Sequence, residues 1–233
     1  MISNLLQKLK FFIKLTYINL NYKNLSDKEI FEKIYREKEW NKSSENMNSG
    51  PGSHDFNLIS PYIKFVQEFL NKNPNLKIID IGCGDFNIGK KIFESSKSYI
   101  GIDIVENLIK ANSINFVHEK LNFICLNIIE EKIPKADCVI VRQVFQHLDN
   151  YSISIILNKI KSFKYAIITE HIPDEYFVPN IDKLTGPNTR LYSKSGVDIE
   201  RDPFDFQFKF KKELIVDDEK FGGLHKTVIY TLR

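Results

Sequence analysis

The sequence has few of the features that mark several common classes of protein. No run reaches the ~18 apolar residues that a membrane-spanning helix needs. It contains only three cysteines, none at metal-ligand spacing, and an odd number argues against a disulfide framework. Lysine and arginine exceed the acids by only three, so charge gives no argument for a nucleic-acid partner. The five histidines are dispersed, which predicts no metal cluster.

These absences favour a cytoplasmic protein with one domain of ordinary size and a substantial core, because 233 residues bury enough surface for that. Free cysteine packs readily in apolar surroundings. We therefore expect reduced, buried thiols at each of the three positions, which are Cys83, Cys125 and Cys138.

The first twenty residues are apolar but interrupted by three lysines, and they contain no small-residue cleavage site. They resemble neither a signal peptide nor an anchor. One helical stripe would contain Leu5, Leu6, Leu9, Phe12, Ile13 and Leu20. We expect it to pack on the protein or on a partner, and peripheral membrane contact is the alternative.

Residues 1–72 are predicted to form a helical extension. The run Ser26-Asp27-Lys28-Glu29 is typical of a helix N-terminus, and that helix should end near Trp40; a second helix is predicted over residues 58–71. Between them lies Ser49-Gly50-Pro51-Gly52-Ser53, a tight turn with exposed backbone amides. This turn is either a surface connection or, with Trp40 beside it, part of a lid over a pocket.

From residue 73 onward, apolar runs alternate with helical patterns. Strands are predicted over 77–81, 99–103, 121–126, 137–142 and 165–170, with helices over 87–95, 105–113 and 150–162. This alternation predicts right-handed crossovers and a parallel sheet. Two further strands, 206–216 and 227–232, are joined by a short turn and predict a terminal antiparallel hairpin. The expected fold is therefore α/β, with a mostly parallel seven-stranded sheet.

In an open α/β sheet, ligands bind beyond the carboxyl ends of the strands. The first strand ends in Asp80 and is followed by a turn with Gly82 and Gly84, while Asp103 ends the second strand. An acid at that spacing can accept hydrogen bonds from both ribose hydroxyls, although a lone strand-end Asp also caps helices. Asn87 stands where the dinucleotide fingerprint has its third glycine. The pattern thus predicts a nucleoside cofactor without a pyrophosphate.

The runs Ile79-Asp80-Ile81-Gly82-Cys83-Gly84 and Gly101-Ile102-Asp103 resemble those of the class I methyltransferases, which use S-adenosylmethionine and have a Rossmann-like fold. Trp40, the turn at 49–53, Asp85 and Gln146-His147-Leu148 extend the likeness to small methyltransferases of bacterial capsule and surface-glycan modification. Those relatives tend to have Asp where this chain has Gln143.

This resemblance implies roles for individual residues. Asp80, Gly82 and Gly84 would hold the methionine part of the cofactor, and Asp103 the ribose. Ile104 and the backbone at Asn127 and Ile128 would flank the adenine. Arg142 or Gln143 would face the sulfonium. The lid, with Trp40, Ser49 and Ser53, would close over the acceptor.

A hydroxyl acceptor loses its proton as the new bond forms, so a positioned base is expected. His147 is the first candidate because imidazole titrates near neutrality, and His171 is the second. Either histidine could instead simply pack within its loop. Arg190 is the expected anion contact, since arginine binds phosphate or carboxylate bidentately. A phosphate or carboxylate acceptor would need no base.

The sequence therefore predicts an S-adenosylmethionine-dependent O-methyltransferase without a metal. Its acceptor would be a small polar molecule, such as a sugar, a sugar nucleotide or a phosphorylated capsule precursor. RNA methylation is one alternative, disfavoured by the scattered charge. A non-catalytic cofactor-binding partner of another methyltransferase is a second alternative, and a dehydrogenase fits less well because of the altered glycine pattern.

Overall fold

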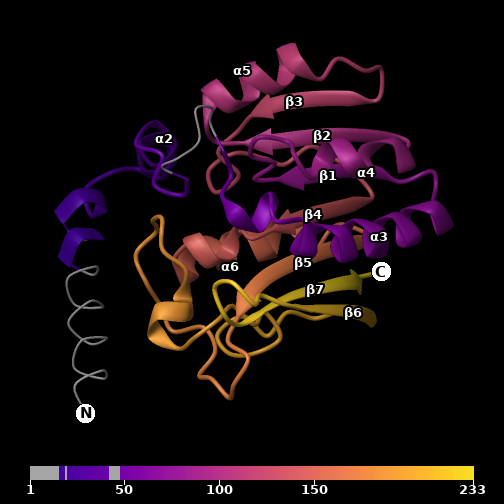
Figure 1. Ribbon diagram of the computed structural model, residues 1–233. Coiled ribbons are helices and arrows are strands. Elements are labelled where there is room, and N and C mark those ends of the chain that lie inside the picture. Colours follow the sequence, from indigo (N-terminus) through magenta and orange to yellow (C-terminus); the bar gives the residue numbers. More distant parts are fainter. Residues whose placement is uncertain (1–15, 19, 42–47) are drawn as a thin grey trace.

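The computed structural model describes residues 16–18, 20–41 and 48–233 (Figure 1). Residues 16–18 and 20–22 are helical, and the other helices of this range are α2 (Asp27–Arg36), α3 (Phe56–Lys72), α4 (Gly89–Ile92), α5 (Glu106–Asn115) and α6 (Asn150–Ile160). Short 3₁₀ turns lie at Pro51–Ser53, Phe93–Ser95, Phe145–His147 and Arg190–Ser193. None of the described helices has both the length and the apolar composition needed to cross a membrane.

Seven strands form one sheet in the order β3-β2-β1-β4-β5-β7-β6 (Figure 1). They are β1 (Lys77–Ile81), β2 (Ser98–Asp103), β3 (Leu121–Cys125), β4 (Cys138–Arg142), β5 (Tyr165–Ile172), β6 (Phe210–Asp217) and β7 (Leu224–Thr231). Strands β1 to β5 pair in parallel, and β7 pairs antiparallel with both β5 and β6. The carboxyl ends of β1, β2 and β3 point toward α2 (Figure 1).

The central strands are buried on both faces, which explains their continuous apolar sequences. On one face, Ile79 and Val139 pack against Ile153, Ile156 and Leu157 of α6. On the other face, neighbouring residues of the same strands pack against α3 and α4; this second cluster includes Ile78, Ile140, Tyr62, Val66, Leu70 and Ile92. Because each face has its own helical cover, the open edge at the strand ends remains available for a ligand.

The predicted α/β fold, the parallel sheet and the terminal hairpin are confirmed. The predicted helix 87–95 is wrong in extent: it is only one α-helical turn followed by a 3₁₀ turn. Ile88 supplies no side-chain cap at its start, and two serines at its end favour the helix weakly. The first strand of the hairpin begins at Phe210 instead of residue 206, and α2 ends at Arg36, before Trp40.

Two further sequence-based expectations concern exposure. Of the three thiols, Cys138 is buried and Cys83 partly so, but Cys125 is exposed at the end of β3, so its predicted burial is wrong. The proposed apolar stripe of the first twenty residues lies mostly outside the described residues. Leu20 is its one described member, and this side chain is 80% exposed.

The start of α2 is held by a reciprocal cap. The Glu29 amide donates to the Ser26 hydroxyl, while the Ser26 amide donates to the Glu29 carboxylate at 2.8 Å. Replacing Ser26 with alanine should lower the free energy of unfolding by about 1 kcal/mol, because an orphan helix amide loses its acceptor. Urea denaturation measures this loss, and Ser26→Thr is the control that should retain most of the stability. Equal stability of the alanine variant would contradict the role of the cap.

Candidate active site

A cavity of about 680 Å³ opens at the carboxyl ends of the parallel strands. Helix α2, the 49–53 turn, the ends of β1, β2 and β4, and the loops 126–129, 187–192 and 218–225 all contribute to its wall. It brings together nearly all the residues singled out in the sequence. These lining residues are Trp40, Ser49, Ser53, Asp80, Gly82, Asp103, Ile104, Asn127, Ile128, Arg142, Gln143, His147 and His171. Two of the candidates, Gly84 and Arg190, do not line it.

The glycine turn after β1 is fixed by its backbone. The amides of Gly82 and Cys83 donate to the Ile102 carbonyl at 2.8 and 3.0 Å, which attaches the turn to β2. Gly82 and Gly84 have φ values of 69° and 54°, a region that side chains disfavour. A Cβ on Gly82 would also collide with Val144. Glycine is therefore required here, and the backbone stays open to the cavity.

Two buried carboxylates lie beside this turn. Asp80 accepts a hydrogen bond from the Tyr99 hydroxyl at 2.8 Å, and Asp103 accepts from the amides of Gly84 and Val105, both at 3.0 Å. Burial raises the pKa of Asp80 to about 7 and that of Asp103 to about 6. The bond to Val105 shows that Asp103 also supports the start of α5. A cationic ligand would favour the ionised form of both groups.

The 49–53 turn is fastened to the glycine turn by residues that sequence analysis left without a role. The Ser49 amide donates to Asp85 at 3.0 Å, and the Asp85 amide donates back to the Ser49 hydroxyl at 2.9 Å. Asn87 donates to the Ser53 carbonyl at 2.6 Å, and His54 contacts Asp85 at 2.6 Å. At the position of the third glycine in the dinucleotide fingerprint, the Asn87 side chain therefore holds the 49–53 turn, which a glycine could not do.

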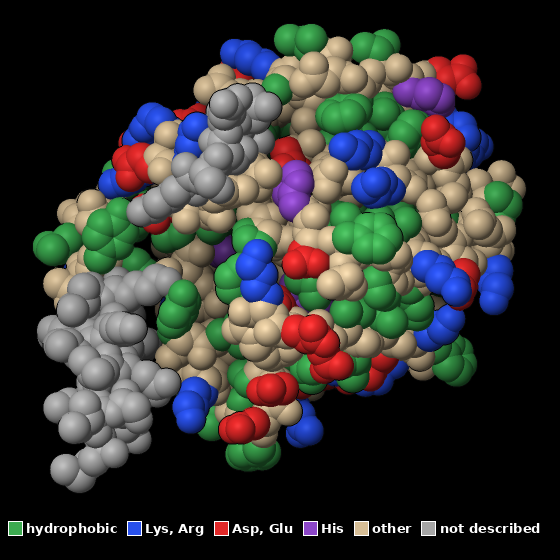
Figure 2. All heavy atoms as spheres, viewed as in Figure 1, with side chains coloured by type: hydrophobic (Ala, Val, Ile, Leu, Met, Phe, Trp, Pro, Cys, Tyr) green, Lys and Arg blue, Asp and Glu red, His purple; other side chains and the backbone are tan. Residues whose placement is uncertain are grey.

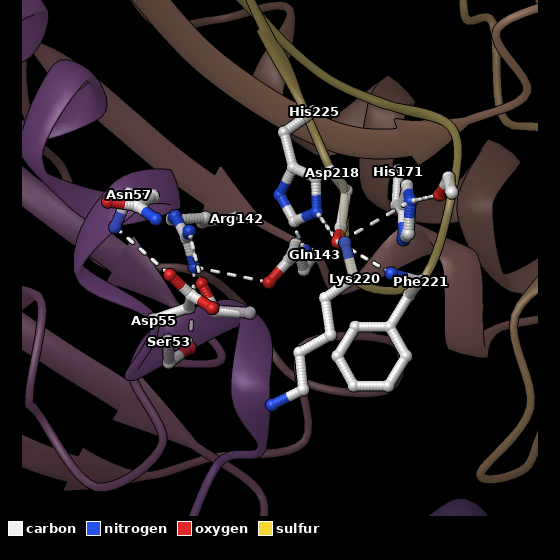
Figure 3. A network of polar contacts seen from close by, with 12 residues as sticks. Ser53, Asp55, Asn57, Arg142, Gln143, His171, Asp218, Lys220, Phe221 and His225 are labelled. Atoms are coloured by element: carbon white, nitrogen blue, oxygen red, sulfur yellow. Dashed lines mark hydrogen bonds and ion pairs between the residues drawn. The ribbon is translucent and has the colours of Figure 1, made fainter.

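The same turn is also attached to the end of β4. The Arg142 guanidinium donates to the Gly52 carbonyl at 2.6 Å and to the Ser53 hydroxyl at 3.3 Å, and it lies 4.9 Å from the centre of the Tyr62 ring. Gly52 packs so closely on the Gln143 amide that a Cβ would overlap it. Arg142 therefore joins the 49–53 turn to the sheet, and Gln143 lies between them on the cavity wall (Figure 3).

His147 lies beside Trp40 on the cavity wall. Its ring centre is 4.7 Å from that of Trp40, whose indole N–H donates to the Pro187 carbonyl at 3.0 Å. The Nδ1 of His147 is buried without a hydrogen-bond partner of good geometry among the described residues. Burial, followed by the charge of Lys183, lowers the pKa of His147 to about 3, so the imidazole is neutral near pH 7 and the expectation that it titrates near neutrality is wrong.

The structure corrects the expectation for Arg190. This side chain is 2% exposed, and its three guanidinium nitrogens donate to the carbonyls of Ile181, Phe145 and Leu148 and to the Asn150 side chain. The guanidinium is therefore used to hold the 181–190 loop against α6 and the turn after β4. It is not positioned to bind an anion in the cavity.

Three titratable side chains converge where β5, β6 and β7 meet the cavity: His171, Asp218 and His225 (Figure 3). The expectation of dispersed histidines is wrong for this pair, because the antiparallel register places His171 directly opposite His225. Asp218 and His225 were missed in the sequence. Their only signal was a position on either side of the Gly222-Gly223 turn that joins the last two strands.

The adenine-side candidates lie on the opposite wall of the cavity. Ile104 and Ile128 offer apolar surface there. The Asn127 amide already donates to the Glu131 carboxylate at 2.9 Å, and its side chain accepts from the Ile129 amide at 3.1 Å. The 126–129 loop is thus held in place by its own hydrogen bonds. A flat apolar base would fit against it without displacing them.

Figure 2 shows side chains of both signs on one face: several acidic side chains lie close together in its lower middle, and lysine and arginine side chains are spread around them. The formal charge of +3 is consistent with this mixture. This face gives a phosphate backbone no continuous positive track to follow.

Residues 79–162 match the family model described as a methyltransferase domain. No curated protein matches the chain. Several solved structures match the chain. One is the N-methyltransferase NodS from Bradyrhizobium japonicum in complex with S-adenosylhomocysteine, with a TM-score of 0.64 at 8% identity. That match covers 85% of this chain and 97% of the other.

Magnesium protoporphyrin IX methyltransferase from Synechocystis, with bound S-adenosylmethionine, matches with a TM-score of 0.59 at 15% identity, covering 89% of this chain and 98% of the other. A putative O-methyltransferase from Nostoc punctiforme gives a TM-score of 0.53 at 16% identity, covering 82% and 64%. At such identities the likeness establishes a shared fold. The acceptors named for these proteins differ from one another.

Proposed function

We propose that this S-adenosylmethionine-dependent methyltransferase, whose domain is of class I, methylates an oxygen of a small polar acceptor. The methyltransferase assignment stands on the family match over residues 79–162 and on the seven-stranded fold with its terminal hairpin. The acceptor class is our inference. It is supported above all by one observation: the imidazole of His147, which is neutral near pH 7, lies on the cavity wall beside Trp40.

The cofactor half of the cavity is the half with the two acids. The methionine ammonium would lie near Asp80 and the glycine turn, the ribose hydroxyls near Asp103, and the adenine between Ile104 and Ile128. Either Gln143 or Arg142, at the end of β4, would then face the sulfonium, and Gln143 is the better candidate because the Arg142 guanidinium is positively charged and donates to Gly52 and Ser53. The remaining space, bounded by Trp40, His147 and the 187–192 loop, would take the acceptor.

When bound, the cofactor supplies a methyl group already activated by the positive sulfur. The protein supplies alignment: the lid excludes water, and the walls hold the acceptor oxygen in line with the carbon–sulfur bond. As the oxygen–carbon bond forms and the carbon–sulfur bond breaks, the hydroxyl proton must leave. His147 is our candidate for taking it, because its ring is neutral and its Nδ1 has no hydrogen-bond partner of good geometry among the described residues. Its pKa of about 3 makes it a weak base, so it would take the proton only as the oxygen–carbon bond forms.

The acceptor that we propose is a sugar, a sugar nucleotide or a phosphorylated precursor, and this choice rests on the resemblance to enzymes of capsule and surface-glycan modification. Arg190 gives no support to the phosphorylated acceptors, since its guanidinium is bonded within the protein. A lid that closes over the acceptor suits a small molecule better than a polymer. The charge pattern in Figure 2 likewise disfavours RNA. We place this activity in the cytoplasm, where the three free thiols would stay reduced.

We treat residues 1–72 as an extension that supplies the lid, and residues 73–233 as the methyltransferase domain. Helix α2 supports this division, since Tyr35 packs against Trp40 at 5.2 Å and shares a hydrogen bond with Ser49. A peripheral membrane contact through residues 1–20 remains part of the proposal. Sedimentation of the full chain with anionic vesicles, compared with a chain lacking residues 1–15, tests that contact.

The test of function combines binding with product analysis. Calorimetric titration should give saturable binding of S-adenosylmethionine and S-adenosylhomocysteine and none of NAD. Incubation with sugars, sugar nucleotides, phosphorylated sugars and RNA should then add one methyl mass to a small acceptor only. Methylated RNA would favour the RNA alternative. Cofactor binding without transfer to any acceptor would favour a non-catalytic partner of another methyltransferase.

Cofactor affinity should depend on pH in a predictable direction. The pKa values of Asp80 and Asp103 are raised, so both gain protons as pH falls from 7.5 to 5.5 and lose their attraction for a cationic ligand. The dissociation constant of S-adenosylmethionine should therefore rise by at least about tenfold over this interval. Titrations at several pH values measure it. Asp80→Asn should flatten the upper part of the profile, and an unchanged profile in that variant would contradict the assignment.

A further inference from the structure

The cluster of His171, Asp218 and His225 has a use that the methyltransferase assignment does not give it. Its possible ligand atoms all lie within 4.8 Å of one another. Asp218 Oδ2 is 3.0 Å from His225 Nε2 and 3.8 Å from His171 Nε2, and the two ring centres are 4.4 Å apart. Ligand atoms bound to a metal at about 2.0–2.1 Å are separated by roughly 3–3.4 Å, so only small shifts separate this arrangement from a coordination shell.

The carboxylate is oriented by its own loop. The amides of Lys220 and Phe221 donate to Asp218 Oδ1 at 3.1 and 2.9 Å, and this leaves Oδ2 directed at the two imidazoles (Figure 3). His225 is oriented in turn, because its Nδ1 lies 3.1 Å from the Gln143 side-chain nitrogen. In metal sites the second ring nitrogen of a ligating histidine donates to an oxygen, which Gln143 would offer with its amide turned over.

The carboxylate of the cluster is buried. Asp218 is 4% exposed, and among the described residues its only ion-pair partners are these two histidines. Buried carboxylates are normally paired with cations or bound to a metal.

We propose that His171, Asp218 and His225 bind a divalent first-row transition ion on the acceptor side of the cavity. Two imidazoles and one carboxylate suit zinc, iron, cobalt or manganese better than magnesium or calcium, which prefer oxygen ligands. Binding moves the Nε2 proton of each ring to Nδ1 without changing its charge. His171 then gives up its 2.7 Å hydrogen bond to the Gly222 carbonyl. The Gln143 amide, whose nitrogen faces His225 Nδ1, must turn over so that its oxygen accepts from that ring, and its 3.2 Å hydrogen bond from Arg142 is lost.

This ion would have open positions toward the cavity that its three ligands line. If the proposed O-methylation is correct, a bound acceptor hydroxyl would lie there with its pKa lowered by the ion, which would ease loss of its proton. That role rests on the proposed function. The metal site itself does not, and it is tested without cofactor or acceptor.

The test is zinc titration of the full chain, free of any affinity tag and first dialysed against a chelator. Calorimetry and elemental analysis should give one ion per chain. Asp218→Asn is the most informative variant, because an asparagine Oδ1 still accepts the two loop amides while the ligand oxygen is lost. It and His225→Gln should weaken binding at least about 100-fold. His118→Gln is the matched control, since His118 is exposed and distant in sequence from the cluster, and it should bind as the native chain does.

If circular dichroism shows that the variants fail to fold, a second measurement on the native chain tests whether both histidines bind the metal. Cobalt added to the native chain should give two hyperfine-shifted, exchangeable imidazole N–H signals in the proton spectrum, one from each ligating ring. Absence of those signals would overturn the proposal. So would a native dissociation constant weaker than about 1 mM, or equal zinc affinity in a folded Asp218→Asn variant. Because S-adenosylmethionine binding is measured separately, failure here leaves the methyltransferase function untouched.

Discussion

Replacing His147 with alanine should reduce turnover by a factor of about 100 or more while leaving the affinity for S-adenosylmethionine nearly unchanged. The imidazole lies beneath Trp40, 4.7 Å between ring centres, and its Nδ1 has no partner of good geometry among the described residues. Loss of the ring removes the group that would accept the hydroxyl proton. It leaves Asp80 and Asp103, on the cofactor side, in place. Turnover and cofactor binding are measured on the same preparation.

Two comparisons make this result specific. His147→Asn keeps a polar side chain but cannot act as a base, so it should be about as slow as the alanine variant. His118→Ala, which removes an exposed histidine, should be as active as the native enzyme. Near-normal turnover in both His147 variants would reduce this residue to a packing role. It would also favour an acceptor oxygen that is already ionised, or activation by the His171–Asp218–His225 cluster.

Replacing Asp103 with alanine should raise the dissociation constant of S-adenosylmethionine about 10- to 100-fold, the worth of one or two charge-assisted hydrogen bonds. Its oxygens each accept one backbone amide, from Gly84 and Val105, and each has a further lone pair for a ribose hydroxyl. Calorimetric titration measures the change. Asp103→Asn, which keeps one acceptor and loses the charge, should fall between the native chain and the alanine variant.

The matched control for this position is Asp137→Asn. Asp137 also accepts a backbone amide, that of Lys77 at 2.9 Å, but it precedes β4 and so lies at the opposite edge of the sheet. Its substitution should leave cofactor affinity unchanged. Native affinity in Asp103→Ala would show that this carboxylate serves only the start of α5, and the ribose assignment would then be withdrawn.

The sheet was predictable because its signals are local. A parallel strand such as β1 is buried on both faces, so its short apolar run identifies it without knowledge of its neighbours. The rule that ligands bind at strand carboxyl ends then placed Asp80 and Asp103 at one edge. The structure puts both on the wall of the same cavity.

The remaining features depend on contacts between distant parts of the chain. Arg190 looked like an anion contact because nothing near it in sequence reveals that Leu148 and Phe145, 42 and 45 residues away, present carbonyls to it. His171 and His225 come together only through the register of β5 with β7. Residue spacing along the chain contains neither fact: the first depends on how two loops pack together, and the second on how two strands pair.

The order of the last two strands has a consequence for how the protein is made. Strand β7 follows β6 in the chain but lies between β5 and β6 in the sheet. During synthesis, the edge of β5 is therefore unpaired while β6 emerges, and β6 has no neighbour to join until β7 is complete. Exposed strand edges promote association between nascent chains. This half of the molecule is where a chaperone would be needed most.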